Sequence, residues 1–95
     1  MKVPSTLECN LLCVLGARAI SDRVLAKRYE KEQGTSISYG TLYTTMRRLK
    51  DSGWVDVRDV DEGDRRVRYF KISGAGSRHL PELHQLKSTF GFGGA

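Results

Sequence analysis

The sequence has no long apolar run and no basic stretch followed by an apolar one. The first absence excludes a membrane-spanning helix, because such a helix needs about 20 predominantly apolar residues. The second argues against an export leader. We therefore expect a cytoplasmic protein that has no membrane partner.

Cysteine and histidine are scarce, with two of each in the chain. Cys9 and Cys13 are spaced as neighbours on a helix, which would suit a metal clasp or an oxidant sensor, but no histidine is near them in the sequence. Their surroundings are apolar, so buried thiols are the simpler interpretation. His79 and His84 are off register for one helical face, and no acidic cluster accompanies them. We expect no metal site and no other cofactor.

The motifs of an enzyme are also missing. Gly74 and Gly76 follow an expected strand, but the third glycine of a phosphate-binding loop and the βαβ pattern beyond it are absent. No nucleophile can be paired with a neighbouring base. The chain is therefore expected not to be an enzyme.

The size and charge of the chain suggest a class of partner. A chain of 95 residues suits a single domain, and a core this small is often completed by oligomerisation. The formal net charge of +5 favours a polyanionic partner such as nucleic acid. Many small basic proteins bind no nucleic acid, so the charge alone does not decide the function.

The segment from Gly40 to Leu49 has the spacing of an amphipathic helix. Its apolar face carries Leu42, Met46 and Leu49, and its polar edge carries Thr41, Thr44, Arg47 and Arg48. Ser38 is the expected N-cap, and Gly53 is the expected left-handed residue that ends the helix. Arginine can bind guanine through two hydrogen bonds, and threonine can bond to bases or phosphates. The polar edge could therefore read a DNA major groove, although an ordinary solvated helix has the same spacing.

Two β-rich runs follow this helix and predict a hairpin. The runs are residues 54–58 and 66–72, and the turn-rich stretch 59–64 lies between them. Arg66 and Arg68 are two residues apart, so they project from one face of the second strand. A reading helix followed directly by a hairpin that carries arginines is typical of a winged helix.

The stretch 59–64 is rich in carboxylates, which would repel DNA phosphates. The acidic residues are Asp59, Asp61, Glu62 and Asp64. We expect this tip of the hairpin to point away from DNA. The arginines at the base of the hairpin, Arg65, Arg66 and Arg68, are then expected to make the contacts.

These two motifs together resemble the PadR family of bacterial winged-helix transcriptional regulators. The family pattern of Gly-Thr-(Leu/Val)-Tyr, a basic helix, a glycine and an apolar strand matches residues 40–55. The wing pattern, an arginine cluster followed by aromatics, an aliphatic, Ser or Thr and a glycine, matches residues 65–76. The resemblance covers roughly residues 7–80. The chain departs from it at Thr44, where the family usually has proline, and at residues 19–22, where the family often has His-Gly-Tyr.

The resemblance implies a mainly α fold with a small β-hairpin, a winged helix-turn-helix with a short C-terminal dimerisation helix. It implies a homodimer that binds double-stranded DNA, acts as a repressor and reads a pseudo-palindromic operator. The expected organisation is a winged-helix domain at residues 1–78, the dimerisation helix at 79–90 and a frayed tail at 91–95. The residues expected at DNA are Ser38, Tyr39, Thr41, Tyr43, Thr44, Arg47, Arg48, Arg65, Arg66 and Arg68.

Two alternatives stay open at this point. Trp54 is most simply a core residue, but some PadR-like regulators bind flat aromatic compounds between subunits, so Trp54 could line a site for a small aromatic effector. The chain could also be a winged-helix module that binds protein and has no operator.

The remaining segments complete the expected fold. Residues 5–8 form a capping-box pattern that opens a first helix, which runs to about Gly16. This helix is apolar most of the way round, so its back is expected to face another subunit. A second helix is expected between the caps Ser21 and Gly34, and residues 35–37 should bridge to the hairpin. Val24, Leu25 and Tyr29 are expected to point into the core. The expected dimer interface comprises Cys9, Leu12, Cys13, Leu83, Leu86 and Phe90.

Overall fold

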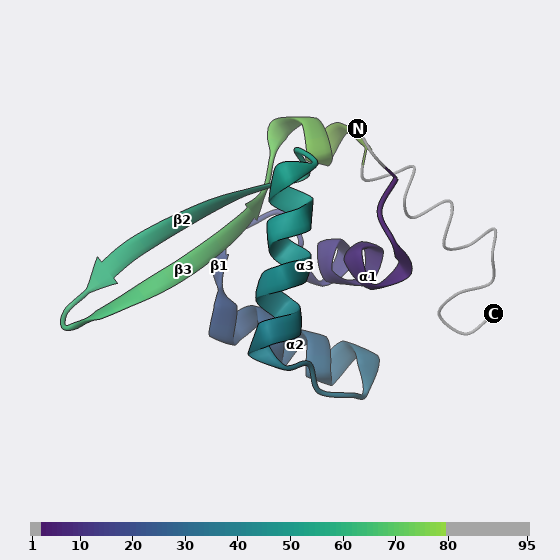
Figure 1. Ribbon diagram of the computed structural model, residues 1–95. Helices are drawn as coiled ribbons and strands as arrows, with labels where there is room; N and C mark the ends of the chain where they lie inside the picture. Colours follow the sequence, from purple (N-terminus) through teal and green to yellow (C-terminus); the bar gives the residue numbers. More distant parts are fainter. Residues whose placement is uncertain (1–2, 80–95) are drawn as a thin grey trace.

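The computed structural model describes residues 3–79 and has a helical body from which a long hairpin projects (Figure 1). The elements are α1 (Thr6–Leu15), β1 (Ile20–Ser21), α2 (Asp22–Gln33), α3 (Tyr39–Asp51), β2 (Val55–Glu62) and β3 (Arg65–Ile72), and residues 74–79 are again helical. This arrangement confirms the expected winged helix. None of the described helices is both long and apolar enough to cross a bilayer. The rest of the expected dimerisation helix, with Leu83, Leu86 and Phe90, and the tail at 91–95 lie outside the described residues.

Serine side chains fix the starts of the three long helices, as the sequence predicts. At α1 the capping box is complete, because Ser5 N donates to Glu8 Oε1 at 3.2 Å and Glu8 N donates to Ser5 Oγ at 3.3 Å. Ser21 caps α2 and Ser38 caps α3 in the same way, through side-chain oxygens that accept backbone N–H groups. Left-handed glycines follow α2 and α3, at Gly34 (φ 72°) and Gly53 (φ 85°). The boundaries of α3 are therefore set by local chemistry.

The sheet has the strand order β1-β3-β2, and all its pairs are antiparallel. The strand that the sequence did not predict is β1, in which Ile20 pairs with Phe70 and Ser21 with Tyr69 of β3. The prediction that residues 35–37 bridge to the hairpin is wrong. Ile20 is buried in the core, whereas the side chains at positions 35 and 36 are exposed and the chain there leads only into the cap of α3.

The hairpin strands are longer than the sequence pattern suggested. The loop predicted at residues 59–64 is wrong, because only Gly63 and Asp64 form the turn and the ladder continues to the pair Glu62↔Arg65. Gly63 has φ 72°, which a two-residue hairpin turn requires. Aspartate is normally depleted in strands, but Asp59 and Asp61 each lie opposite an arginine of β3. These opposite charges stabilise the pairing.

The core lies between the three helices and the inner part of the sheet. Its fully buried large side chains are Leu11, Leu12, Leu15, Leu25, Leu42, Met46, Leu49 and Phe70. Trp54 is 3% exposed and belongs to this core, as the simpler interpretation predicted. Two expectations need correction. Leu12 is fully buried within the single chain, so it fills the core and is not free to face a partner, and Val24 is 41% exposed and does not point inward.

After β3 the chain turns back tightly against the start of β2. Ser73 N donates to Trp54 O at 2.9 Å, and Ser73 Oγ donates to Gly53 O at 2.7 Å. Gly76 N in turn donates to Ser73 Oγ at 2.9 Å. A Cβ atom at Gly76 would lie 2.4 Å from Trp54 O, so this close approach requires glycine. These contacts join the end of α3, the hairpin and residues 74–79.

Candidate nucleic-acid interface

The edge of α3 that faces away from the core is polar and basic. Its exposed side chains include Thr41, Thr44, Arg47 and Arg48. The opposite face of the helix is buried in the core, so the helix is held in place through that face and this edge stays exposed to solvent. Thr45 is buried, and its Oγ1 donates to the carbonyl of Thr41 at 2.7 Å. Because the hydroxyl group of Thr45 has this hydrogen-bond partner within the helix, the polar side chain can be buried in the core.

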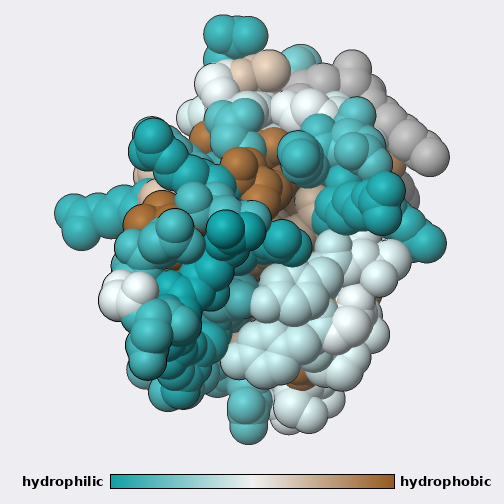
Figure 2. Space-filling model, turned by 60° about the vertical axis from the view of Figure 1, so that its left-hand side comes forward, coloured by the Kyte–Doolittle hydropathy of each residue, from teal (hydrophilic) through white to brown (hydrophobic). Residues whose placement is uncertain are grey.

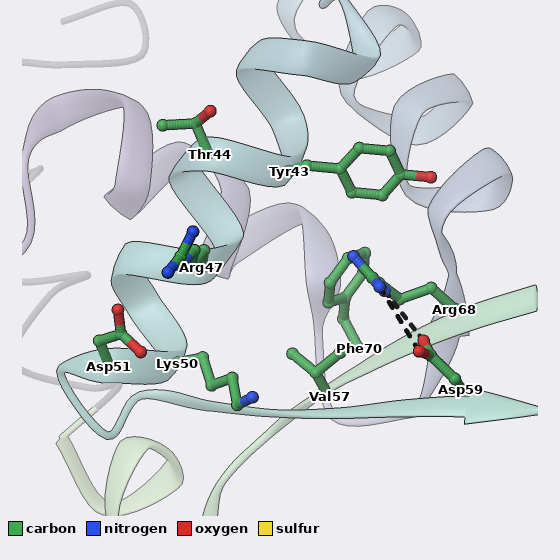
Figure 3. Close-up of a pocket in the computed structure, with 9 residues that line it drawn as sticks. All are labelled: Tyr43, Thr44, Arg47, Lys50, Asp51, Val57, Asp59, Arg68 and Phe70. Carbon is green, nitrogen blue, oxygen red and sulfur yellow. Dashed lines mark hydrogen bonds and ion pairs between the residues drawn. The ribbon is translucent and has the colours of Figure 1, made fainter.

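A groove separates α3 from the hairpin, with a cavity volume of about 540 Å³. It is lined by Tyr43, Thr44, Arg47, Lys50, Asp51, Val57, Asp59, Arg68 and Phe70 (Figure 3). Arg47 and Lys50 form no ion pair within the described part of the chain, and both side chains are exposed. The groove therefore offers two cations outside any ion pair beside the hydroxyl of Thr44, which suits an anionic partner, although Asp51 and Asp59 also line it.

Arg48 lies apart from this groove. It borders a second depression with Val3, Glu8 and Ser52, on the side of α3 that faces α1. The sequence analysis placed Arg47 and Arg48 on the same edge of the helix. In the structure Arg47 lies on the side of α3 that faces the hairpin, and Arg48 lies on the side that faces α1. Arg48 is exposed and so remains available to a backbone phosphate.

Arg66 and Arg68 lie on one face of β3, and both are paired with aspartates. Arg68 Nε lies 2.9 Å from Asp59 Oδ1 and Arg68 Nη2 lies 3.4 Å from Asp59 Oδ2, while Arg66 Nε lies 3.3 Å from Asp61 Oδ1. The hydrogen bond from Arg68 lowers the pKa of Asp59 and raises that of Arg68. The expectation of a repulsive acidic tip is therefore wrong for these two aspartates, because arginines compensate their charges.

Arg65 also lies elsewhere than expected. It begins β3 and pairs with Glu62 next to the turn, so it is at the tip of the hairpin and not at its base. Its side chain is on the other face of the hairpin from Arg66, beside the start of α2, in a depression shared with Arg23 and Lys27.

The side of the molecule from which the hairpin projects is largely hydrophilic (Figure 2).

Tyr43 is engaged inside the protein on both its ring and its hydroxyl. The hydroxyl donates to Asp22 Oδ2 at the start of α2, and the guanidinium carbon of Arg68 lies 5.3 Å from the ring centroid. The ring of Tyr39 is 6.1 Å away and is itself 47% exposed. The hydrogen bond to Asp22, together with burial, raises the pKa of Tyr43 to about 12. Tyr43 is thus a donor to Asp22 at neutral pH.

Of the residues predicted at DNA, the groove between α3 and the hairpin brings together Tyr43, Thr44, Arg47 and Arg68, whereas Arg48 and Arg65 border other depressions. Sequence reasoning missed Lys50, Asp22 and Asp59. Lys50 could have been found, because it is three residues after Arg47 and shares the edge of the helix. Asp59 could have been found by placing the turn at Gly63-Asp64, since that register sets it opposite Arg68. Asp22 carried no comparable signal, because its partner is distant in the sequence.

Comparison with known proteins agrees with the motifs. The family model described as the transcriptional regulator PadR-like family matches residues 11–82. A search of curated proteins finds no match. The structure is similar to that of a PadR-like transcription factor from Bacteroides fragilis, with 24% sequence identity and a TM-score of 0.77 over 88% of this chain and 82% of that one.

Two further solved structures have the same fold. Bacillus subtilis PadR in complex with operator DNA shares 19% identity and has a TM-score of 0.70, over 81% of this chain and 45% of that one. A transcriptional regulator from Clostridium thermocellum shares 17% identity and has a TM-score of 0.76, over 90% of this chain and 85% of that one.

Proposed function

Because the chain belongs to the PadR-like family of transcriptional regulators, we propose that it is a cytoplasmic, dimeric repressor that binds double-stranded DNA at a pseudo-palindromic operator. In this proposal α3 lies in the major groove and the hairpin lies along the neighbouring backbone or minor groove. The protein performs no chemistry on its partner.

The exposed edge of α3 carries this proposal. Thr44 and Arg47 project from one side of a helix whose opposite side is buried, so they can meet base edges. Thr41 lies on the same exposed side, and its hydroxyl accepts from Ser38 Oγ at 3.0 Å. Arg47 makes no ion pair among the described side chains, and an arginine of this kind can bind guanine through two hydrogen bonds. Arg48 points to another side and is assigned to a backbone phosphate.

The dimer follows from the geometry of DNA. Two copies of α3 read paired half-sites when they are about 34 Å apart, one turn of the double helix. We propose that residues 1–78 form the DNA-binding domain and that residues 79–90 pair with a partner subunit. Cys9 and Cys13 are half-buried on α1, and we keep both in the proposed dimer interface.

The alternative of a protein-binding module loses one of its supports. It rested on an acidic hairpin tip, yet Asp59 and Asp61 are each bonded to an arginine. The structure also gives no support to an aromatic effector at Trp54, since that side chain is 3% exposed within the single chain. We therefore leave both out of the proposal.

The test compares two adjacent arginines of α3 on the same DNA. A duplex enriched by the wild-type protein from a random-sequence pool is titrated with Arg47→Ala and with Arg48→Ala. We expect Arg47→Ala to lose about 1–3 kcal/mol on that duplex and to discriminate less against single-base changes, because a base contact is lost. Arg48→Ala should weaken binding to all sequences alike, because a phosphate carries no sequence information.

Arg18→Ala provides the control for charge. Arg18 is exposed in the turn after α1 and does not line the groove, so its removal should leave discrimination unchanged. A folded Arg47→Ala protein that discriminates as well as the wild type would refute the assignment of α3. A wild-type protein that enriches no sequence would refute the proposed function itself.

A further inference from the structure

Four side chains form a continuous network across the elements that surround the groove. Asp22 on α2 accepts from Tyr43 of α3, the ring of Tyr43 lies against Arg68 of β3, and Arg68 donates to Asp59 of β2. We call these four residues the Tyr43 network. Figure 3 shows three of its members, Tyr43, Arg68 and Asp59.

One face and one edge of the Arg68 guanidinium are occupied. Its face lies over the Tyr43 ring at 5.3 Å, and its edge makes two hydrogen bonds to the Asp59 carboxylate at 2.9 and 3.4 Å. A planar guanidinium can stack on a ring and make two parallel hydrogen bonds to a carboxylate at once, whereas an ammonium cannot reproduce that geometry. To turn the edge formed by Nε and Nη2 toward a phosphate, Arg68 would have to release Asp59 and move off the Tyr43 ring.

Arg66 provides an internal comparison on the same face of the same strand. It has a single contact, at 3.3 Å to Asp61, and its side chain is 70% exposed. The side chain of Arg68 is 45% exposed. Arg66 can therefore exchange its aspartate for a phosphate at little cost, because exposed ion pairs contribute little.

The position of Arg68 along the hairpin is also informative. The short strand β1 pairs only with Tyr69 and Phe70, so the sheet has three strands at these two residues and only two from Arg68 to the tip of the hairpin. Two-stranded ribbons vary most in twist and have little stability of their own. Arg68 is the first residue of β3 beyond the support of β1, and the Tyr43 network ties that residue to α3.

We propose that Tyr43 and Arg68, held by Asp22 and Asp59, are positioning residues that fix the angle of the hairpin relative to α3. Contact with DNA phosphates from the hairpin then falls to Arg65 and Arg66 near the tip. This inference rests on the proposed function as far as DNA is concerned, but the angle of the hairpin is a property of the free protein. It reverses the sequence-based assignment of Tyr43 and Arg68 to direct DNA contact.

The experiment measures hairpin orientation without DNA and the salt dependence of binding with DNA. Residual dipolar couplings and backbone order parameters are recorded for the ¹⁵N-labelled full chain as wild type, Arg68→Ala, Arg68→Lys, Tyr43→Phe and Arg66→Ala. In both Arg68 variants the order parameters of residues 59–66 should fall from about 0.85 toward 0.6, and the couplings should report a changed orientation relative to α3. Tyr43→Phe keeps the ring and loses the bond to Asp22, so its change should be smaller. Arg66→Ala should leave the orientation unchanged.

The same variants are titrated with the enriched duplex over a series of salt concentrations. Arg66→Ala should lower the slope of log K against log salt by about one, because one phosphate contact is lost. Arg68→Ala should weaken binding to the enriched duplex. In a protein that already carries Arg65→Ala and Arg66→Ala it should lower the slope no further, because Arg68 itself contacts no phosphate. Arg68→Lys should behave like Arg68→Ala despite its retained charge, since it cannot make the planar contacts.

Two results would overturn the inference. One is an unchanged hairpin orientation in both Arg68 variants, and the other is a slope that Arg68→Ala lowers by about one even when Arg65 and Arg66 are already alanine. Should Arg68→Ala fail to fold, Arg68→Lys and Tyr43→Phe decide the question by the same two measurements. A wild-type protein that prefers no duplex would refute the proposed function, while the couplings would still decide the role of the Tyr43 network.

Discussion

Tyr43 connects α2, α3 and β3 through one side chain, and its ionisation provides a direct measure of that connection. Its hydroxyl donates to Asp22, and its pKa is raised to about 12 from an ordinary value of 10.0. A raised pKa means that the fold favours the protonated phenol. The contribution to stability is therefore complete below pH 10 and is lost as the pH rises from 10 to about 12.

We expect the near-ultraviolet absorbance of tyrosinate to show a final ionisation step near pH 12 that is absent from Tyr43→Phe. Circular dichroism recorded in parallel separates this step from alkaline unfolding. The pKa of Tyr69 is also raised, by its bond to Glu62, so the assignment depends on the difference between wild type and variant. Titration curves that superimpose below the unfolding pH would show that the bond to Asp22 does not form in solution.

At the scale of elements, the sequence predicted the helices far better than the sheet. Helix α3 combines apolar side chains at helical spacing with a serine cap and a left-handed glycine, and all of these signals depend on nearby residues. The core of α3 and its exposed basic edge followed from the same spacing. The strand Ile20–Ser21 could not be predicted in this way, because its two residues become a strand only by pairing with β3.

The hairpin was located correctly and its turn was not. Acidic residues and a glycine suggested a loop at residues 59–64, since aspartate and glycine are common in turns. The cross-strand pairing of Asp59 with Arg68 and Asp61 with Arg66 overrides that preference. These two pairs form only when the strands meet, and the contacts of the Tyr43 network likewise form only in the folded protein. The roles of Tyr43 and Arg68 could therefore not be derived from the spacing of residues in the sequence.

The packing of residues 74–79 against the start of β2 leads to a prediction about an element. A methyl group at Gly76 would lie 2.4 Å from the carbonyl oxygen of Trp54, and that oxygen belongs to the backbone and accepts from Ser73. Gly76→Ala should therefore lower the free energy of unfolding by about 1–3 kcal/mol in urea denaturation, because the two elements must separate. Gly74 is two residues away, and a Cβ atom there would meet nothing within 4 Å.

Gly74→Ala is thus the matched control and should change stability by no more than about 0.5 kcal/mol. Equal stabilities of Gly76→Ala and Gly74→Ala would mean that the close approach of Gly76 to Trp54 is not maintained in solution.

For the whole molecule, the prediction concerns assembly. A chain of 95 residues has a small core, and two reading helices are needed to bind paired half-sites. We expect sedimentation equilibrium at micromolar concentration to show a dimer in the absence of DNA. Leu86→Glu should make the protein monomeric or unfolded and abolish specific DNA binding, because it would bury an unpaired charge in the interface.

Leu83→Ser is a milder variant of the same surface, since it removes an apolar side chain without adding charge, and it should weaken the dimer less. A wild-type protein that sediments as a monomer would contradict the dimer while leaving the assignment of α3 intact.

The two-residue turn at the end of the hairpin limits how the gene can change its length. The turn at Gly63-Asp64 needs a hydrogen-bonded pair at its base, and such pairs alternate along an antiparallel ladder. Codons can therefore be inserted or deleted without altering the turn only as two in each strand, four in total. Each step changes the reach of the hairpin by about 7 Å, roughly two base pairs along DNA. Mutation can thus vary the span of the contact in discrete increments while α3 and the core stay as they are.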